Sequence, residues 1–108
     1  MYKQERVRSL LLRIAAEFIA EHWILDSRVA ISRVEVSRGL KAAVIYVTVH
    51  PESQEKNALR ELAAIGPKLY NDLAGKLKIK FTPRFVFRID EGEKNREKVE
   101  ELLRGLKN

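Results

Sequence analysis

The first half of the chain changes from a helical to an alternating spacing of hydrophobic residues. Between Gln4 and His22 the apolar side chains fall on one side of a helix, as in an amphipathic helix that packs on a core. This stripe consists of Val7, Leu10, Leu11, Ile14 and Phe18. Residues 34–49 instead alternate on both sides of the turn Ser37-Arg38-Gly39, which predicts a β-hairpin. Its second strand is apolar on both faces, so we expect it in the centre of a sheet.

Residues 51–77 predict two helices joined by a kink. Pro51 ends the preceding strand because it has no backbone N–H, and it suits the first turn of a helix. Gly66-Pro67 interrupts the helical pattern, since glycine weakens a helix and proline disfavours helical geometry in the residue before it. The expected buried side chains are Ala58, Leu59, Leu62 and Ala63 before the kink, and Leu69, Tyr70, Leu73, Ala74 and Leu77 after it.

The segment GKLKIKFTPRFVFRID, residues 75–90, places a cation at nearly every second position. Its parity predicts one strand with an apolar face made of Ile79, Phe81, Phe85, Phe87 and Ile89. The opposite face would carry Lys78, Lys80, Thr82, Arg84 and Arg88. We expect a bend at Pro83 and an edge position in the sheet, where proline is tolerated. Beyond Gly92, a short amphipathic helix is expected from the spacing of Val99, Leu102, Leu103 and Leu106.

The order of these elements predicts an α+β fold with a three-stranded mixed sheet. The two middle helices form a connection long enough for the third strand to lie parallel beside the second. We expect helices to cover one face of the sheet and to leave the other face open, with Tyr46 near its centre. An exposed ring there has two interpretations: a platform that stacks a base, or a ring covered by the aliphatic stems of lysines.

Composition argues against several classes of protein. With 108 residues, the chain has the length of one domain, which can bury a modest core without cross-links. It has no cysteine, so it forms neither disulfides nor thiolate metal sites, and we expect an intracellular protein. We expect no membrane span and no signal peptide, because no apolar run approaches roughly 20 residues and the first residues are charged. His22 and His50 lie apart from any carboxylate pair, and no nucleotide-binding or nucleophile motif occurs, which argues against an enzyme, a metal ion or a cofactor.

A formal net charge of +6 indicates a polyanionic partner. No acidic residue lies between Asp72 and Asp90, so we expect the cations from Lys76 to Arg88 not to be neutralised locally. Two interpretations stay open for this row: contacts with phosphates, or protection of an edge strand against aggregation. A second basic edge runs along the first helix and consists of Lys3, Arg6 and Arg13.

Four segments together resemble the type II KH fold and, in particular, the ribosome-binding factor A family of bacteria. They are the arginine-bearing first helix, the turn Asp26-Ser27-Arg28-Val29, the hairpin VEVSRGLKAAVIYVTV and the strand LKIKFTPRFVFRID. Ala64-Ile65-Gly66 matches the Ala-x-Gly kink that this family carries in place of the KH GxxG loop. The resemblance runs from Arg6 to Asp90. The chain departs from the family pattern at Ser27, Gly39 and Lys80, where proline, aspartate and arginine are usual.

The resemblance implies a ribosome assembly factor that binds the immature small (30S) ribosomal subunit and its 16S rRNA. Such proteins assist late maturation, including formation of the 5′ region of the rRNA, and are linked to growth in the cold. They are not enzymes, and the resemblance implies no cofactor. We accordingly expect a cytoplasmic, monomeric RNA-binding protein, with a KH-like domain at residues 1–90 and a charged C-terminal helix or tail at residues 91–108.

The expected RNA-binding residues lie on the first helix, at the kink and along the third strand. They are Lys3, Arg6, Arg13, Ala64, Gly66, Lys68, Lys76, Lys78, Lys80 and Arg84. At the kink, Gly66 would let the following helix present backbone N–H groups to a phosphate, although a kink that serves only helix packing is the other interpretation. The alternative function is a protein-interaction or dimerisation module that uses the open face of the sheet.

Overall fold

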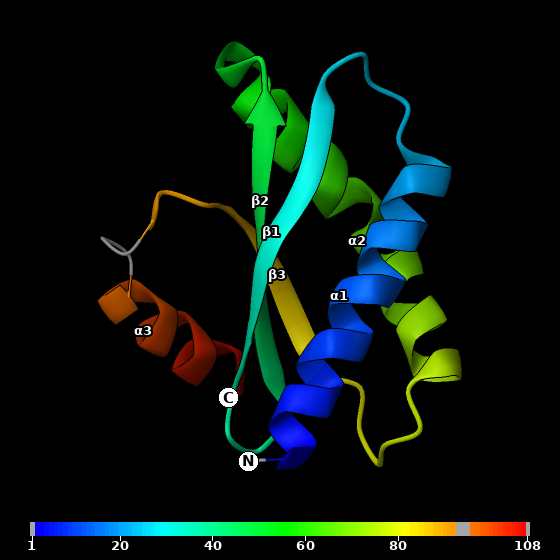
Figure 1. Ribbon diagram of the computed structural model, residues 1–108, viewed down its shortest axis with the longest axis vertical. Coiled ribbons are helices and arrows are strands. Elements are labelled where there is room, and N and C mark those ends of the chain that lie inside the picture. Colours follow the sequence, from blue (N-terminus) through cyan, green and yellow to red (C-terminus); the bar gives the residue numbers. More distant parts are fainter. Residues whose placement is uncertain (1, 93–95, 108) are drawn as a thin grey trace.

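The structure of the protein is a computed structural model that describes residues 2–92 and 96–107. Its elements are α1 (Tyr2–His22), β1 (Arg28–Val36), β2 (Ala42–His50), the short 3-10 helix η1 (Glu52–Gln54), α2 (Glu55–Lys76), β3 (Arg84–Ile89) and α3 (Arg96–Lys107). β1 and β2 pair antiparallel as a hairpin, and β3 lies parallel beside β2. The arrangement (Figure 1) confirms the predicted α+β fold, with β2 in the centre of the sheet and β3 at an edge. None of the described helices combines the length and the apolar character that a membrane crossing requires.

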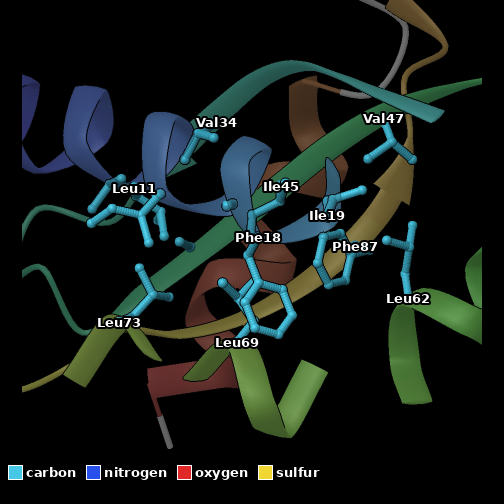
Figure 2. Packing of buried hydrophobic residues seen from close by; sticks show 14 of the residues in the cluster. Leu11, Phe18, Ile19, Val34, Ile45, Val47, Leu62, Leu69, Leu73 and Phe87 are labelled. Atoms are coloured by element: carbon cyan, nitrogen blue, oxygen red, sulfur yellow. The ribbon is translucent and has the colours of Figure 1, made fainter. Parts of the chain in front are cut away.

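α1 and α2 cover one face of the sheet and enclose the main hydrophobic core (Figure 1). Figure 2 shows side chains of both helices meeting those of the strands. Among them, Leu11, Phe18, Ile45, Leu62 and Leu69 are at most 6% exposed. Burying one such side chain contributes roughly 1.5–3 kcal/mol, so this layer supplies most of the hydrophobic stabilisation of the fold.

β1 carries a β-bulge at Ser32 that changes which of its residues face the core. Ile31 and Arg33 pair with consecutive residues of β2, so Ser32 is an extra residue without a partner in the ladder. Because side chains alternate along a strand, one extra residue moves the following residues to the other face. Val29 and Ile31 therefore pack on the main core before the bulge, and Val34 does so after it.

α3 packs on the second face of the sheet, which we expected to be open (Figure 1). Leu102 and Leu103 lie against Val44 and Tyr46 of β2, and Tyr46 is only 1% exposed. The prediction was wrong because β2 is apolar on both faces, so its second face needs a cover as much as its first. Tyr46 is therefore not available to stack a base, and α3 occupies the face through which a partner protein was expected to bind.

α2 is one continuous helix across Gly66-Pro67, where we expected two helices joined by a kink. Pro67 cannot donate a hydrogen bond to the carbonyl of Ala63, four residues earlier. Ala63 is exposed, so water can donate to that carbonyl instead. Gly66 has no Cβ to collide with the proline ring, which relieves the usual restriction on the residue before a proline. The helix therefore continues through both residues.

β3 spans only Arg84–Ile89, so the predicted strand was wrong for residues 77–83, which form an irregular loop. Pro83 has no N–H for a ladder. The first hydrogen bond to the hairpin instead comes from the next residue, whose N–H donates to the Lys41 carbonyl at 3.0 Å. The loop also turns Phe81 outwards: we expected this ring in the core, and it is 60% exposed.

Replacing both Leu102 and Leu103 by alanine tests the packing of α3. Both side chains are partly buried against β2, so we expect the free energy of unfolding to fall by about 1–3 kcal/mol in total. Urea denaturation followed by circular dichroism measures the change. Arg104→Ala, at an exposed position of the same helix, is the control. Equal stability of the double variant and the wild type would mean that α3 does not pack on the sheet.

Candidate nucleic-acid interface

Three segments far apart in the sequence meet at one end of the molecule. The start of α1, the β1–β2 turn (residues 37–41) and the loop 77–83 all lie at the lower end of Figure 1. Gln4 Nε2 on α1 donates a hydrogen bond to the Val36 carbonyl at the end of β1, at 2.6 Å. The N–H of Arg84, just after the loop, donates to the Lys41 carbonyl in the turn at 3.0 Å. These hydrogen bonds fix the three segments relative to one another.

The exposed cations of these segments, together with Lys76 at the end of α2 and Arg84 at the start of β3, form a surface that we name the basic end. Its members are Lys3, Arg6, Arg38, Lys41, Lys76, Lys78, Lys80 and Arg84. Neither the turn nor the loop contains an acidic residue. The start of α1 adds one acid, Glu5, which lies 3.6 Å from Arg8. A cluster in which cations outnumber acids in this way raises the local potential and attracts polyanions. The lysines at positions 78 and 80, predicted on a strand, contribute to this surface from the loop instead.

Lys76 differs from the other members of the basic end. Its Nζ lies 3.1 Å from the carboxylate of Asp72, one helical turn earlier, so the prediction that this row is not neutralised was wrong at its first residue. An exposed pair of this kind contributes a few tenths of a kcal/mol, so a phosphate can replace the carboxylate at little cost. Among the residues whose side chains are described, the other members of the basic end form no ion pair.

Arg13, Ala64 and Lys68 were predicted to bind RNA but belong to none of the segments that form the basic end. Arg13 is farther along α1 and faces Glu17 at 4.0 Å. Ala64 lines a separate hollow beside η1. Lys68 is exposed on α2 but is not part of the wall that Gly66 lines. The structure therefore does not bring these three residues together with the rest of the predicted set.

A groove of about 520 Å³ lies between α2 and the free edge of β3, and it reaches the basic end at Arg84. Gly66, Pro67 and Tyr70 line the side of α2, and Phe85 is among the residues that line the side of β3. A Cβ atom added at Gly66 would meet no heavy atom within 4 Å apart from its own helix and chain neighbours. Packing against other elements therefore does not require glycine here. The remaining reasons are the proline that follows and a ligand that approaches the backbone.

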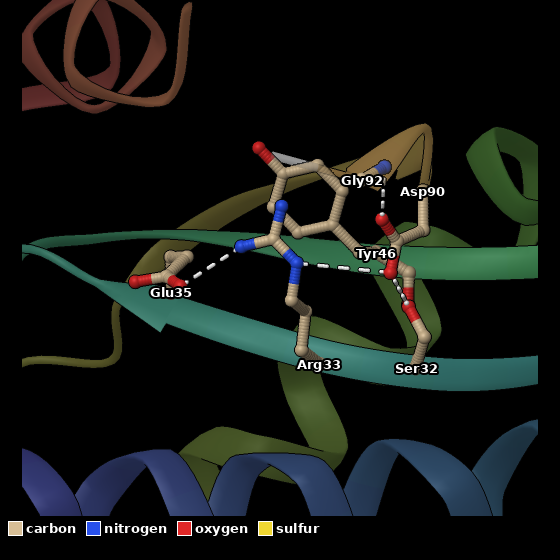
Figure 3. Close-up of polar contacts among 6 residues, drawn as sticks. All are labelled: Ser32, Arg33, Glu35, Tyr46, Asp90 and Gly92. Carbon is tan, nitrogen blue, oxygen red and sulfur yellow. Dashed lines mark hydrogen bonds and ion pairs between the residues drawn. The ribbon is translucent and has the colours of Figure 1, made fainter. Parts of the chain in front are cut away.

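A polar cluster on the second face of the sheet ties the end of β3 to the hairpin (Figure 3). The Asp90 carboxylate accepts hydrogen bonds from the Ser32 hydroxyl and from the Gly92 N–H, the latter at 2.8 Å. Arg33 Nε lies 3.7 Å from the same carboxylate. The Ser32 and Gly92 donors hold the pKa of Asp90 below its usual value; the charge of Arg33 adds to this effect, and partial burial opposes it. Asp90 thus stays ionised and holds the bulge of β1.

Arg33 links this carboxylate to the rest of the cluster. Its guanidinium donates to Glu35 at 2.9 Å and lies 3.9 Å from the centroid of the Tyr46 ring. Burial raises the pKa of Tyr46, and the positive charge of Arg33 partly opposes the shift. Shifted pKa values are common at catalytic sites, but here each charged group already has partners within the cluster. We therefore assign the cluster to holding β3 on the hairpin.

Arg38 and Lys41 are the members of the basic end that the sequence analysis missed. Both lie in the turn between β1 and β2. The sequence pattern predicted this segment only as a connection between two strands. The signal was present as two cations in a turn without an acid. These two cations become part of a larger basic surface only through the loop 77–83, which is far from the turn in the sequence and close to it only in the folded chain.

The family model described as ribosome-binding factor A matches residues 3–103. The chain belongs to the ribosome-binding factor A family. The factor of Caldanaerobacter subterraneus is 26% identical to it over an alignment of 110 positions that covers 97% of this chain and 89% of the relative. The factor of Xanthomonas euvesicatoria is 32% identical over 78 residues, which cover 72% of this chain and 60% of the relative. The matched part is thus less than two thirds of the Xanthomonas protein.

Solved structures agree with this membership. The crystal structure of ribosome-binding factor A from Thermus thermophilus has a TM-score of 0.68 and 26% identity, and the match covers 80% of this chain and 93% of that one. A Thermotoga maritima protein, at 23% identity, shows the shared fold alone, with a TM-score of 0.73 over 84% of this chain and 90% of that one. A homology model of the Thermus thermophilus factor, fitted into a cryo-EM map of its complex with the 30S subunit, has a TM-score of 0.67 and 25% identity, over 77% and 90% of the two chains. The predicted family and fold are confirmed.

Asp90→Asn tests the polar cluster. We expect it to lower the free energy of unfolding by about 0.5–1.5 kcal/mol at neutral pH, because a neutral amide oxygen accepts weaker hydrogen bonds from Ser32 and Gly92 than a carboxylate does. The lowered pKa of Asp90 means that folding favours its ionised form. The contribution of Asp90 to stability is therefore fully present above the usual pKa of 3.8, and it is lost as the pH falls through the lower pKa of the folded state. Urea denaturation from pH 7 to about pH 3 measures the difference between variant and wild type. A difference that stays constant over this range would contradict the assignment.

Proposed function

We propose that this protein is a cytoplasmic ribosome assembly factor that binds the immature small (30S) subunit and its 16S rRNA precursor and assists late maturation. The observation that carries the proposal is the basic end, where exposed cations from separate segments gather on a member of the ribosome-binding factor A family. The Thermus thermophilus factor has been fitted into a map of its 30S complex, which supports the same partner for this chain.

The mechanism that we propose is binding without a chemical step. Lysine and arginine contacts to phosphates release counterions, so they give affinity that falls as salt rises, and they position a protein without reading sequence. A factor that binds one rRNA conformation more tightly than another shifts the equilibrium by that difference in affinity. Membership of a family of ribosome-binding factors supports a protein that acts by binding and is not an enzyme.

Within this proposal, the cations of the basic end contact rRNA phosphates, and the two cations of the β1–β2 turn join the predicted set. Gly66 admits the RNA backbone to the groove between α2 and β3. Arg13 and Lys68, which are exposed but lie elsewhere, contribute a longer-range attraction. Ala64 lines a separate hollow, and we assign it no contact.

Co-sedimentation tests the proposal directly. The full chain is mixed with immature small subunits, with mature small subunits and with assembled ribosomes, and the bound fraction is measured after centrifugation. We expect binding to immature subunits to exceed binding to the other two. Equal binding to all three kinds of particle, or binding to none, would refute an assembly factor.

Combining Lys78→Glu, Lys80→Glu and Arg84→Glu reverses three charges at the basic end. We expect binding to immature subunits to weaken by about tenfold or more, because attraction to phosphates is replaced by repulsion. The slope of log affinity against log salt should fall by roughly 2–3, or about one for each phosphate that the variant no longer binds. Titrations at rising salt measure both quantities, and circular dichroism checks that the variant is folded.

The matched control reverses the same number of charges at exposed positions at the start of β1 and in the first two turns of α2, and both of these elements begin in the upper half of Figure 1. It carries Arg28→Glu, Lys56→Glu and Arg60→Glu. The control has the same net charge as the first variant and should retain most of the affinity. If both triple variants lose affinity equally, net charge rather than the position of the cations would account for binding.

Gly66→Ala separates the two remaining reasons for this glycine. Alanine favours a helix by about 1 kcal/mol over glycine, and the clash with the following proline opposes this gain, so we expect a change in unfolding free energy of less than about 1 kcal/mol. The added methyl group stands in the groove, so affinity for immature subunits should fall several-fold. Titration with immature subunits measures the affinity, and urea denaturation measures the free energy of unfolding. A large loss of stability with unchanged affinity would assign Gly66 to the helix alone.

A further inference from the structure

Phe81 is the exposed aromatic residue that the fold leaves without an evident role. Its ring is 60% exposed, although the alternating pattern predicts it on the core face. Single exposed apolar side chains are ordinary on protein surfaces and need no explanation by themselves. The surroundings of this ring, however, differ from those of Ile24, which is 77% exposed. Ile24 belongs to the connection between α1 and β1, which runs in the upper half of Figure 1.

The ring of Phe81 lies in a segment rich in cations. Lys78 and Lys80 lie on the same loop, and Arg84 follows it; all are exposed, and no acidic residue lies between them. Lys80 Nζ is 5.5 Å from the centroid of the Phe81 ring. A partner that covers this ring must therefore also accept several positive charges, which favours a polyanion over the apolar surface of another protein.

The loop that carries Phe81 is held at both ends. Leu77 is 5% exposed and Pro83 is fully buried, so the residues on either side of the exposed segment are anchored in the protein. Next to the ring, the Thr82 carbonyl accepts a hydrogen bond from the Tyr70 hydroxyl of α2 at 3.4 Å. The backbone next to the ring is thus in contact with α2 beside the groove. A ring presented in this way loses little freedom when it stacks on a ligand.

We propose that Phe81 is a stacking platform for an unpaired base of single-stranded RNA, while Lys78, Lys80 and Arg84 hold the phosphates beside that base. A flat apolar ring matches the face of any base, and base–aromatic stacking tolerates all sequences. In a duplex the base faces are already stacked on one another, so this pairing of ring and cations suits a single strand. The proposal rests on the RNA-binding function above and names the kind of RNA that the basic end takes.

The test compares Phe81→Ala, Phe81→Leu and Phe81→Tyr in the full chain, with Ile24→Ala as the control for removal of an exposed apolar side chain. The probes are a fluorescein-labelled single-stranded oligoribonucleotide of mixed sequence and a hairpin duplex of the same length. Binding is followed by fluorescence anisotropy at several salt concentrations. Urea denaturation of each variant checks that the fold is intact, and we expect it to be unchanged because the ring is exposed.

We expect Phe81→Ala to bind the single strand about 5- to 100-fold more weakly, with the same salt slope as the wild type because the phosphate contacts remain. Phe81→Tyr should keep most of the affinity, and Phe81→Leu should lose more than Phe81→Tyr because it is apolar without a flat ring. Binding of the duplex should change little in any variant. The Ile24→Ala control should bind both probes as the wild type does.

A direct readout comes from Phe81→Trp, in which stacking should quench the new indole fluorescence on addition of the single strand, beyond any change seen from Trp23 in the wild type.

Equal affinity of Phe81→Ala and wild type for the single strand would overturn the proposal. So would an equal loss on single strand and duplex, or failure of the wild type to bind the single strand at roughly 100 µM, the weak limit of non-specific binding. A loss seen with subunits but not with naked RNA would assign the ring to a ribosomal protein.

Co-sedimentation of the wild type separates this inference from the proposed function. If wild type and Phe81→Ala bind immature subunits equally well, the stacking role fails and the assembly function stands. If the wild type itself does not bind immature subunits, the assembly function fails, and the oligoribonucleotide titrations still decide whether the ring stacks on RNA.

Discussion

The rest of the fold depends on the burial of β2 on both of its faces. Every residue from Ala42 to Val47 is buried, and because side chains alternate along a strand, each face of the sheet needs a cover. β1 and β3 form hydrogen bonds with the backbone of β2 on either side. α1 and α2 cover one face of the sheet, and α3 covers the other. If the second face stayed in water, the fold would lose roughly 1.5–3 kcal/mol of hydrophobic stabilisation for each large side chain on it. This gain in stability favours the packing of α3 on that face.

The basic end follows from the topology of the sheet rather than from a contiguous motif. β2 and β3 are parallel, so α2 must carry the chain back to the end at which β2 begins. That return brings the loop 77–83 beside the β1–β2 turn. The hairpin also ends β1 there, and the hydrogen bond from Gln4 to the Val36 carbonyl holds the start of α1 at the same place. Cations that are far apart in the sequence therefore converge, and those of α1 and the turn add to the basic row around the loop 77–83.

Local pattern was sufficient to predict most elements, whereas tertiary contacts decided the rest. The spacing of apolar residues identified α1, the hairpin and the order of the sheet, because each element repeats one buried face. It could not show where β3 begins, since the alternation includes Phe81 although Pro83 cannot join a ladder. Nor could it show that α3 covers Tyr46, because the stripe with Leu102 and Leu103 fits any apolar surface. At the candidate site, the cations of the loop were visible in the sequence, but their proximity to those of the turn exists only in the folded chain.

Three features that cost folding energy belong to the groove and to the basic end. Gly66-Pro67 weakens α2, the exposed ring of Phe81 forgoes its hydrophobic gain, and neighbouring cations of the basic end repel one another. The polar cluster around Asp90 is different, because its charged groups satisfy one another. Natural sequences keep such local costs mainly where function requires them. Since the groove and the basic end meet at Arg84, their shared position supports one continuous binding surface on physical grounds that do not depend on family membership.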